Sequence, residues 1–332
     1  MSRGQVRSYR AADFTPGELL RAKGDQRVSV VVPARDEQET VGDIVSRIRR
    51  DWMAGVPLVD QLVVVDSDST DATAARAAAA GATVVSAAAI RPDLGPAQGK
   101  GEALWKAQHV VTGDLLVFVD ADLTEWGSHF VPGLLGPLLT LPEVALVKSC
   151  YQRPLRSPAG GTGVYGESGG RVTELVARPL IALHRPELAD VVQPLSGEWA
   201  VRRSVLRELP IPVGYGVEIA VLLDTASRYG VPAIAQVDLG RRGHRHHHHD
   251  LLGAMALQVM AAVERRIPNR LFTTPDGDEA RLRQFARVDG GFVATDRDVA
   301  VWERPPAVLV GLAAPEPIPA GCAAAGSAGE VR

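Results

Sequence analysis

Several features that mark other protein classes are scarce in or missing from this chain of 332 residues. No run of 18 or more apolar residues occurs, so we expect no membrane-spanning helix. The first residues, MSRGQVRSYRAADF, contain no apolar stretch, so we expect no signal peptide. The formal net charge is only −3, which gives no sign of a basic nucleic-acid-binding surface.

Cysteine is also scarce, with only Cys150 and Cys322, which lie far apart in the sequence. This usage favours reduced thiols and a cytoplasmic location. What the chain does have is apolar residues, at 46% of the sequence, which is ample for a packed core. Its length suggests one large domain or two smaller ones.

Short apolar runs alternate with helical patterns in the first half of the chain. Continuous apolar strands separated by helices predict an α/β fold with a mostly parallel sheet covered on both faces. In such sheets ligands bind beyond the carboxyl ends of the strands. We predict strands at 28–32, 62–66, 82–87, 115–120 and 144–150, with helices at 40–50, 71–81 and 101–111.

The second half of the chain is more helical. We predict helices at 169–184, with an interruption at Pro179, at 214–230 and at 251–267, and a strand at 232–239. Residues 305–332 are rich in Pro, Ala and Gly and lack periodicity, so we expect disorder there.

The stretch LLVFVDADLTEW carries the clearest chemical signal. Five apolar residues lead directly into Asp120 and Asp122. Residues i and i+2 of an extended strand point to the same side, so the two carboxylates can converge on one cation. Hard oxygen ligands suit Mg²⁺ or Mn²⁺. We favour a metal site over the alternatives, a helix cap or a solvated loop.

Three other loops are candidates for nucleotide contacts, each with an ordinary structural alternative. In VVVDSDSTD, Asp66 and Ser67 could contact a nucleotide, whereas Asp68 and Asp71 suit helix capping. In PARDEQET the backbone and Glu37 could read a base, or the acidic residues could serve a helix dipole. Lys100, between two glycines in GPAQGKGEALW, could bind phosphate or lie on the surface.

Two stretches of the second half contain candidates for anion or metal binding. GESGGRVTEL places Gly170, Arg171 and Thr173 at a helix start, where amides, a guanidinium and a hydroxyl could bind a phosphate or carboxylate. A flexible loop with a surface arginine is the alternative. RRGHRHHHHD holds five of the eight histidines, and we favour a solvated loop over metal storage.

The ordered set of motifs resembles one family, the actinobacterial glucosyl-3-phosphoglycerate synthases. It consists of PARDEQET, VVVDSDSTD, GKGEALW, VFVDADL, GGRVTELVARPL, QPLSGEWA, GYGVEI and AQVDLGRRGHR, and covers about residues 28–265. The resemblance implies a retaining glycosyltransferase of the glycosyltransferase-A fold. It further implies UDP-glucose as donor, the C2 hydroxyl of 3-phosphoglycerate as acceptor, and Mg²⁺ or Mn²⁺ as cofactor.

The resemblance also assigns roles to individual residues. It implies that Asp122 and His244 bind the metal, and that Gly170, Arg171, Thr173 and His246 bind the acceptor. It places Asp120, Asp122, Glu218 and the backbone of Leu195 at the reacting centre. Donor contacts fall to Pro33, Ala34, Glu37, Asp66, Ser67, Lys100, Asp120, Tyr215 and Arg242, the last near the phosphates.

The same resemblance predicts the organisation of the chain. We expect an N-terminal extension (1–27), a nucleotide-sugar-binding half (28–150), an acceptor-binding half with a C-terminal helix (151–270) and a C-terminal extension (271–332). The apolar face of the helix at 251–267 and the habit of the family predict a homodimer. The alternatives are a mannosyl-3-phosphoglycerate synthase that uses GDP-mannose, a nucleotidyltransferase, and a non-catalytic nucleotide-binding module.

Overall fold

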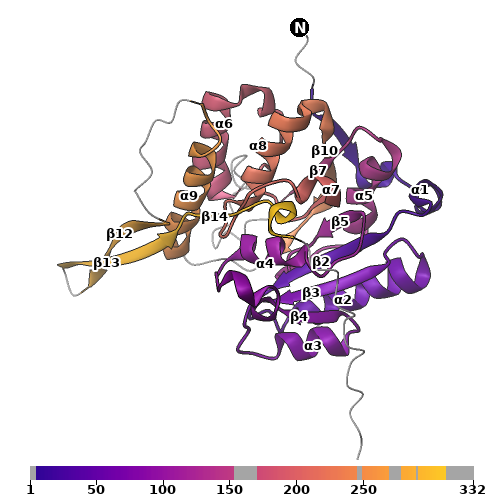
Figure 1. Cartoon of the computed structure of the whole chain (residues 1–332), viewed down its shortest axis with the longest axis horizontal. Coiled ribbons are helices and arrows are strands. Elements are labelled where there is room, and N and C mark those ends of the chain that lie inside the picture. The colour runs from indigo at the N-terminus through magenta and orange to yellow at the C-terminus, as the bar shows by residue number, and fades with distance from the viewer. Residues whose placement is uncertain (1–4, 153–169, 245–248, 269–277, 289–290, 312–332) are drawn as a thin grey trace, which may run out of the picture.

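An eight-stranded sheet forms the centre of the molecule (Figure 1). The computed structural model describes residues 5–152, 170–244, 249–268, 278–288 and 291–311. Neighbouring strands in the sheet follow the order β1 (Arg7–Arg10), β10 (Ile234–Arg241), β7 (Leu146–Gln152), β8 (Trp199–Arg202), β5 (Leu115–Phe118), β2 (Val28–Ala34), β3 (Gln61–Asp66) and β4 (Thr83–Ser86).

Every neighbouring pair in this sheet is parallel except the two that involve β8. The predicted α/β fold with a mostly parallel sheet is therefore confirmed. Parallel strands end at the same edge, so Asp66, the last residue of β3, and Asp120, which follows β5, lie along one edge. Because β8 runs in the opposite direction, its first residue, Trp199, lies at that edge as well.

Helices cover both faces of the sheet. Alternate residues of a strand point to opposite faces, so Val30 and Val32 pack on one side and Val31 on the other. Burial on both faces explains why the central strands read as uninterrupted apolar runs. One face carries α1 (Pro16–Lys23), α2 (Val41–Arg49), α3 (Thr73–Ala79) and α5 (Phe130–Thr140), and the other carries α4 (Lys100–Ala107), α6 (Arg178–His184), α8 (Val217–Tyr229) and α9 (His249–Glu264).

The predicted interruption at Pro179 is wrong. The segment continues from a π-helical turn, Thr173–Ala177, directly into α6. Proline clashes with the carbonyl four residues before it in a regular α-helix, and the wider π turn relieves that contact. The helical segment therefore continues through Pro179.

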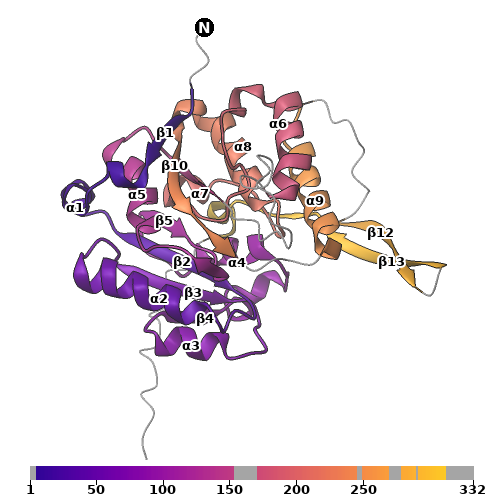
Figure 2. The same cartoon turned by 180° about the vertical axis from the view of Figure 1, so that it is seen from behind.

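The ends of the chain contribute more structure than the sequence suggested. The expected N-terminal extension contains β1, which joins the central sheet. The expected C-terminal extension contains a long hairpin, β12 (Glu279–Val288) and β13 (Gly291–Ala300), which projects from the body beyond α9 (Figures 1 and 2). Strand β14 (Glu303–Arg304) then pairs with β9 (Ile211–Pro212).

The expectation of disorder from about residue 305 does not hold for residues 305–311. Ala307 is fully buried in a short helical turn, and the Trp105 indole N–H donates to the Pro305 carbonyl. Residues 312–332 lie outside the described residues. Over the part of the chain that is described, no helix has both the length and the apolar character needed to cross a bilayer.

Candidate active site

Asp120 lies at the centre of an ion-pair cluster at the carboxyl edge of the sheet. Its Oδ1 is 2.5 Å from Lys100 Nζ, and its Oδ2 is 2.8 Å from Arg242 Nη2. Lys100, the first residue of α4, also reaches Glu218 Oε1 at 2.8 Å. The sheet edge, α4 and α8 therefore meet at the Lys100 ammonium group.

Arg242 contacts two further carboxylates, those of Asp122 and Glu198. Its guanidinium donates to Glu198 Oε1 at 2.9 Å and lies 3.5 Å from Asp122 Oδ1. Burial lowers the pKa of Arg242, but the combined attraction of Glu198, Tyr151 and the two aspartates raises it well above its usual value. Burial raises the pKa of Glu198, which Arg242 partly offsets.

Gly197 is required for this close approach. A Cβ atom at this position would lie 2.0 Å from Asp120 Oδ2 and 2.8 Å from Lys100 Nζ. Both atoms belong to the buried ion-pair network, so neither can move away freely. In the stretch SGEW, Gly197 therefore leaves space for the cluster, and Glu198 provides one of the carboxylates of the cluster.

A buried lysine lies beside the cluster. Lys148 is 1% exposed and donates from Nζ to the Ser196 carbonyl oxygen at 2.9 Å. Burial lowers its pKa to about 7, against the attraction of Glu218. The pKa of Lys100 shifts in the opposite direction, because Asp120 and Glu218 raise it well above the usual value despite the opposing effect of burial.

The donor set at this edge fits a divalent cation. Asp120 and Asp122 both face one guanidinium nitrogen, so their oxygens converge as predicted, but residues 121 and 122 form a turn instead of the extended strand on which the prediction was based. Strand β11 (Gly243–His244) pairs with β6 (Leu123–Glu125), which sets the backbone of His244 opposite Leu123, next to Asp122. Four carboxylates share the cations Lys100 and Arg242, and this excess negative charge suits Mg²⁺ or Mn²⁺.

The described residues alone do not complete a coordination shell. Among the described residues, no group of three or more His, Cys, Asp and Glu side chains is arranged to hold a metal ion. The residues named at this edge leave positions for oxygens of a bound ligand, as a catalytic metal site requires. His246 and the following two histidines lie outside the described residues.

Hydrogen bonds connect the loops that are predicted to contact the sugar nucleotide, at the same edge of the sheet. The Ser67 amide donates to the Ala34 carbonyl at 2.9 Å, and the Glu37 amide donates to Thr73 Oγ1 at 2.7 Å. Thr40 Oγ1 donates to the carbonyl of Ala121, the residue between the two aspartates. The loops that follow β2, β3 and β5 thus form one continuous rim, which begins with Pro33 and Ala34 at the end of β2.

Asp66 and its neighbour Asp71 have different surroundings. Asp66 is buried, with Oδ2 accepting from the Ser69 amide and Oδ1 without a partner in the described chain. Asp71 accepts from the Thr73 amide at 2.9 Å, the first amide of α3, but the N-cap residue is Ala72, so the predicted N-cap role of Asp68 and Asp71 is wrong. The free buried oxygen of Asp66 is consistent with the alternative that we kept open, a ligand contact.

The described acceptor candidates lie at one helix start, and the donor candidate Tyr215 lies at another. Arg171 is exposed and Thr173 is buried, where the π-helical turn begins, and Gly170 precedes them. Tyr215 lies just before α8, and its amide donates to Gln258 of α9. Burial raises the pKa of Tyr215, and the charges of Lys100 and Asp120 act on it, so it borders the ion-pair cluster.

Sequence reasoning missed three residues of the cluster. Glu198, Gly197 and Lys148 were not singled out, although SGEW is part of the motif set. The signal that could have identified Glu198 was a glutamate directly before an apolar strand. Arg242 was expected near phosphates, whereas the structure pairs it with carboxylates, and a phosphate contact stays a prediction. Leu195 lies in the same loop, one residue before Ser196.

Comparison with known proteins agrees with this geometry. Residues 29–157 match the family model described as glycosyl transferase family 2. A glucosyl-3-phosphoglycerate synthase of Mycolicibacterium paratuberculosis is 50% identical over 257 residues, 77% of each chain. That of Mycolicibacterium smegmatis is 46% identical over 299 residues, 90% of this chain and 95% of its own length.

A solved structure is similar over nearly the whole chain. It is the Mycobacterium tuberculosis glucosyl-3-phosphoglycerate synthase in complex with Mn²⁺, UDP-glucose and phosphoglyceric acid. The TM-score is 0.80 at 43% identity, and the match covers 93% of this chain and 100% of the other.

Proposed function

The chain belongs to the glucosyl-3-phosphoglycerate synthase family, and from this premise we infer that it is a metal-dependent glucosyltransferase with the glycosyltransferase-A fold. It transfers glucose from UDP-glucose to 3-phosphoglycerate and releases UDP. The observation that carries this function is the cluster in which Asp120, Asp122, Glu198 and Glu218 share Lys100 and Arg242 at the ligand-binding edge of the sheet.

The donor side of the site follows from the rim of loops. We propose that Pro33, Ala34, Glu37, Asp66 and Ser67 contact the uridine part. Their support is the hydrogen bonds that join these loops and the unpartnered buried oxygen of Asp66.

The metal ligands are proposed from the edge next to β11. Asp122 and His244 would hold Mg²⁺ or Mn²⁺, supported by the β6–β11 register that sets their backbones side by side. When bound, the cation neutralises charge on the departing diphosphate. Lys100 and Arg242 orient Asp120 through the contacts at its two oxygens, and they add positive charge beside the diphosphate.

The acceptor side is proposed at the helix that begins before Thr173. Arg171 and Thr173, with the amide of Gly170 and with His246, would bind the phosphate and carboxylate of 3-phosphoglycerate. Holding both anionic groups orients the C2 hydroxyl toward the sugar. Leu195 through its backbone, and Tyr215 and Glu218 through their side chains, would border the transferred glucose.

We propose that transfer retains the anomeric configuration without a covalent enzyme intermediate. Each carboxylate of the cluster already contacts Lys100 or Arg242, so none is placed as a free nucleophile. In a front-face transfer, the C2 oxygen of the acceptor bonds to the anomeric carbon of glucose as the bond between that carbon and the UDP phosphate oxygen breaks, and the leaving phosphate accepts the hydroxyl proton.

Product identification tests this function. The protein is incubated with 3-phosphoglycerate, Mg²⁺ and either UDP-glucose or GDP-mannose, and the products are analysed by mass spectrometry and NMR. We expect glucosyl-3-phosphoglycerate with an α-linkage, equal amounts of UDP, and little product from GDP-mannose. Asp122→Ala is the matched inactive control.

The other outcomes identify the alternatives. A preference for GDP-mannose indicates a mannosyl-3-phosphoglycerate synthase, and release of pyrophosphate from a nucleoside triphosphate indicates a nucleotidyltransferase. No turnover with any sugar nucleotide, for wild type and Asp122→Ala alike, indicates a binding module. An inverted linkage rejects the front-face transfer but leaves the substrates as proposed.

We further propose a homodimer, though on different grounds from the predicted helix face. Val259 and Val263 of α9 are almost fully buried, and Leu252 and Met255 pack against the same core, so that face is occupied by its own chain. The support comes instead from the β12–β13 hairpin, whose base packs on α9, where Gln258 donates to the Ala300 carbonyl. The rest of the hairpin projects beyond α9, and a two-stranded ribbon is marginal in water by itself.

The exposed part of this hairpin carries apolar side chains. Phe285 is 66% exposed and Val293 is 51% exposed, on neighbouring positions of the two strands. We expect sedimentation equilibrium at micromolar concentration to give twice 35.3 kDa. Phe285→Ser is expected to shift the equilibrium toward monomer. A single 35.3 kDa species for wild type would reject the dimer.

A cytoplasmic location is also part of the proposal. Its support is the lone described cysteine, Cys150, which is free, together with a donor and acceptor that are products of intracellular metabolism. Fractionation of the source cells, with activity measured in each fraction, tests it.

A further inference from the structure

A pocket of about 230 Å³ lies away from the catalytic edge and is lined mainly by arginines. Arg202, Arg203 and Arg207 contribute three guanidinium groups, and Asp114 is the only carboxylate in the lining. The arginines come from the end of β8 and from α7 (Arg203–Leu206) with the residue that follows it. The pocket therefore carries an excess of positive charge.

Two of the lining residues already have hydrogen-bond partners within the fold. Arg202 donates to the carbonyls of Val144 and Leu138 at 2.8 and 2.7 Å, next to the end of α5. The carboxylate of Asp114 accepts from the Arg27 amide at 2.8 Å. Arg202 and Asp114 therefore form the wall of the pocket.

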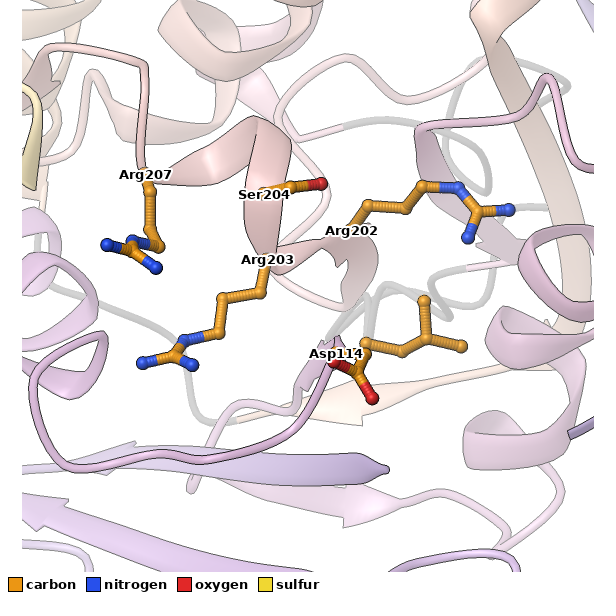
Figure 3. A pocket seen from close by; sticks show the side chains of 6 residues that line it. Asp114, Arg202, Arg203, Ser204 and Arg207 are labelled. Carbon is orange, nitrogen blue, oxygen red and sulfur yellow. The ribbon is translucent and has the colours of Figure 1, made fainter. Parts of the chain in front are cut away.

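Arg203 and Arg207 lack comparable partners among the described residues. The Nε of each is buried and makes no hydrogen bond there. The Arg203 guanidinium donates only to the Gln108 carbonyl, at 3.3 Å, and no hydrogen bond or ion pair with a described residue holds the Arg207 guanidinium. In Figure 3 these two guanidinium groups lie on the same side of α7, and Arg202 points away from them.

The electrostatic surroundings agree with an unbalanced positive charge. Burial lowers the pKa of Arg203, and the nearby charge of Arg207 lowers it further, more than Asp114 restores. His109 is also affected: burial lowers its pKa to about 4, with contributions from Arg203 and Arg207. Two like charges held close together and partly desolvated are stabilised by a bound anion.

We propose that this pocket is a second anion site, which binds a small phosphate-bearing anion between Arg203 and Arg207. Guanidinium groups recognise phosphate through charge-assisted hydrogen bonds, and Arg203 and Arg207 both line the pocket. The volume is below the range of roughly 300–1,000 Å³ typical of pockets for larger organic ligands. The size therefore favours inorganic phosphate or a small phosphorylated metabolite over a nucleotide.

The pocket lies at the opposite end of the strands that carry the catalytic cluster. Leu115 at the start of β5 pairs with Arg202, whereas Phe118 at its end pairs with Trp199, beside Glu198. Four residues of strand span about 13 Å. The anion site is thus distinct from the donor and acceptor sites, and it does not depend on the proposed function.

Calorimetric titration with inorganic phosphate tests the proposal. The full-length protein is first saturated with UDP, 3-phosphoglycerate and Mg²⁺, so that the phosphate positions of the active site are filled, and ionic strength is held constant with chloride. We expect wild type to bind one phosphate. Arg207→Gln and Arg203→Gln are each expected to weaken binding about tenfold or more. Asp114→Asn is expected to tighten it, because it removes the opposing charge.

Matched controls separate the site from other effects. Arg281→Gln removes a surface arginine of the hairpin and is expected to bind phosphate like wild type. Circular dichroism verifies folding, and if an arginine variant does not fold, tighter binding by Asp114→Asn decides in favour of the site. The proposal is overturned if wild type binds no phosphate, if Arg207→Gln binds like wild type, or if Arg171→Ala alone removes binding.

Discussion

At the scale of single residues, the chemistry depends on how charges are shared rather than on any one group. Arg242 is 3% exposed and contacts three carboxylates, one of which, Glu198, is fully buried. Removing one member of a buried ion pair leaves an uncompensated charge, which is more costly than losing an exposed pair. Exposed residues such as Arg171 are therefore better probes of ligand contacts, because their loss does not disturb the cluster.

Arg171→Ala is expected to separate acceptor binding from donor binding. A charge-assisted phosphate contact is worth about 1.5–3 kcal/mol, so the affinity for 3-phosphoglycerate is expected to fall roughly 10- to 100-fold. The affinity for UDP-glucose is expected to change little. Calorimetric titration of each ligand measures both.

The chain offers a matched control for this change. Arg178 is another arginine of the same helical segment, but it is ion-paired with Glu174 at 2.8 Å. Arg178→Ala is expected to leave both affinities near their wild-type values. Equal losses for donor and acceptor in Arg171→Ala would show that the acceptor site is misassigned.

Asp122→Ala and His244→Ala are expected to differ in degree. Asp122→Ala removes a hard carboxylate ligand and is expected to abolish metal-dependent binding of the donor. His244→Ala is expected to lower turnover and to change the ratio of activity with Mn²⁺ to activity with Mg²⁺, because imidazole suits Mn²⁺ better. Titration of both metals in steady-state assays measures these effects.

The neighbouring histidines provide the comparison. Replacing His246 to His249 with Ser is expected to leave more activity than His244→Ala if the run is a solvated loop and His246 is not critical for the acceptor. His244→Ala with wild-type turnover and an unchanged metal dependence would refute the ligand role of His244.

At the scale of elements, α4 connects the catalytic cluster to the rest of the fold. Its first residue is Lys100, and its first amides donate to the backbone of the segment after β9, with Gly101 bonded to Gly214 and Glu102 to Val213. This contact requires close approach of two backbones, which is possible only because residue 101 has no side chain. The position of Lys100 therefore depends on the packing of a helix start against a loop.

Gly101→Ala is expected to displace α4 and lower both stability and turnover. A Cβ atom at residue 101 would lie 1.8 Å from the Pro212 carbonyl oxygen, which belongs to rigid backbone. Such overpacking costs about 1–3 kcal/mol in the free energy of unfolding. Urea denaturation and steady-state assays measure the two effects.

A second helical glycine serves as the control. A Cβ atom at Gly42 in α2 meets only the Arg76 carbonyl, at 3.9 Å. Gly42→Ala is expected to raise the free energy of unfolding by about 0.4–1 kcal/mol, because it restricts the unfolded chain. Unchanged turnover in Gly101→Ala would mean that α4 tolerates the displacement and that Lys100 is positioned by its ion pairs alone.

At the scale of the whole molecule, the segment that contains β14 is bonded to α4 in the first half of the chain. Arg304 in β14 makes two hydrogen bonds to Glu102 of α4, at 2.8 and 2.9 Å. It also donates to the carbonyls of Leu94 and Gly95, and it lies over the Trp105 ring. The buried Arg304 guanidinium thus connects residues more than 200 positions apart in the sequence. Its partner Glu102 lies in the same helix as Lys100.

Arg304→Met is expected to destabilise the whole fold. Glu102 is 2% exposed and would keep only Lys106, at 3.4 Å, as an ion-pair partner. Breaking a buried pair from one side costs about 3–5 kcal/mol, and the remaining lysine puts this case near the lower figure. The midpoint of urea denaturation measures the loss.

Two further variants define the interpretation. The double variant Glu102→Gln, Arg304→Met is expected to be less destabilised than Arg304→Met alone, because no buried charge is left unpaired. Arg281→Met breaks a surface pair with Asp298 and is expected to cause no measurable change. If Arg304→Met behaves like Arg281→Met, the buried network does not secure the C-terminal segment.

The sequence by itself determined the features that depend on local pattern. The apolar runs at β2, β3 and β5 predicted a parallel sheet, because burial on both faces removes the usual alternation. The D-x-D spacing predicted that Asp120 and Asp122 converge, because residues i and i+2 of an extended chain point to the same side. The ordered motifs were enough to indicate the family.

Only the tertiary structure decided which distant residues meet. The antiparallel strand β8 brings Glu198 to the catalytic edge, and strand order depends on packing between segments far apart in the sequence. The same holds for β14, which places Arg304 on Glu102, and for Lys148, whose lowered pKa arises from burial. The local sequence pattern does not indicate these contacts, because desolvation and ion pairing depend on the three-dimensional surroundings.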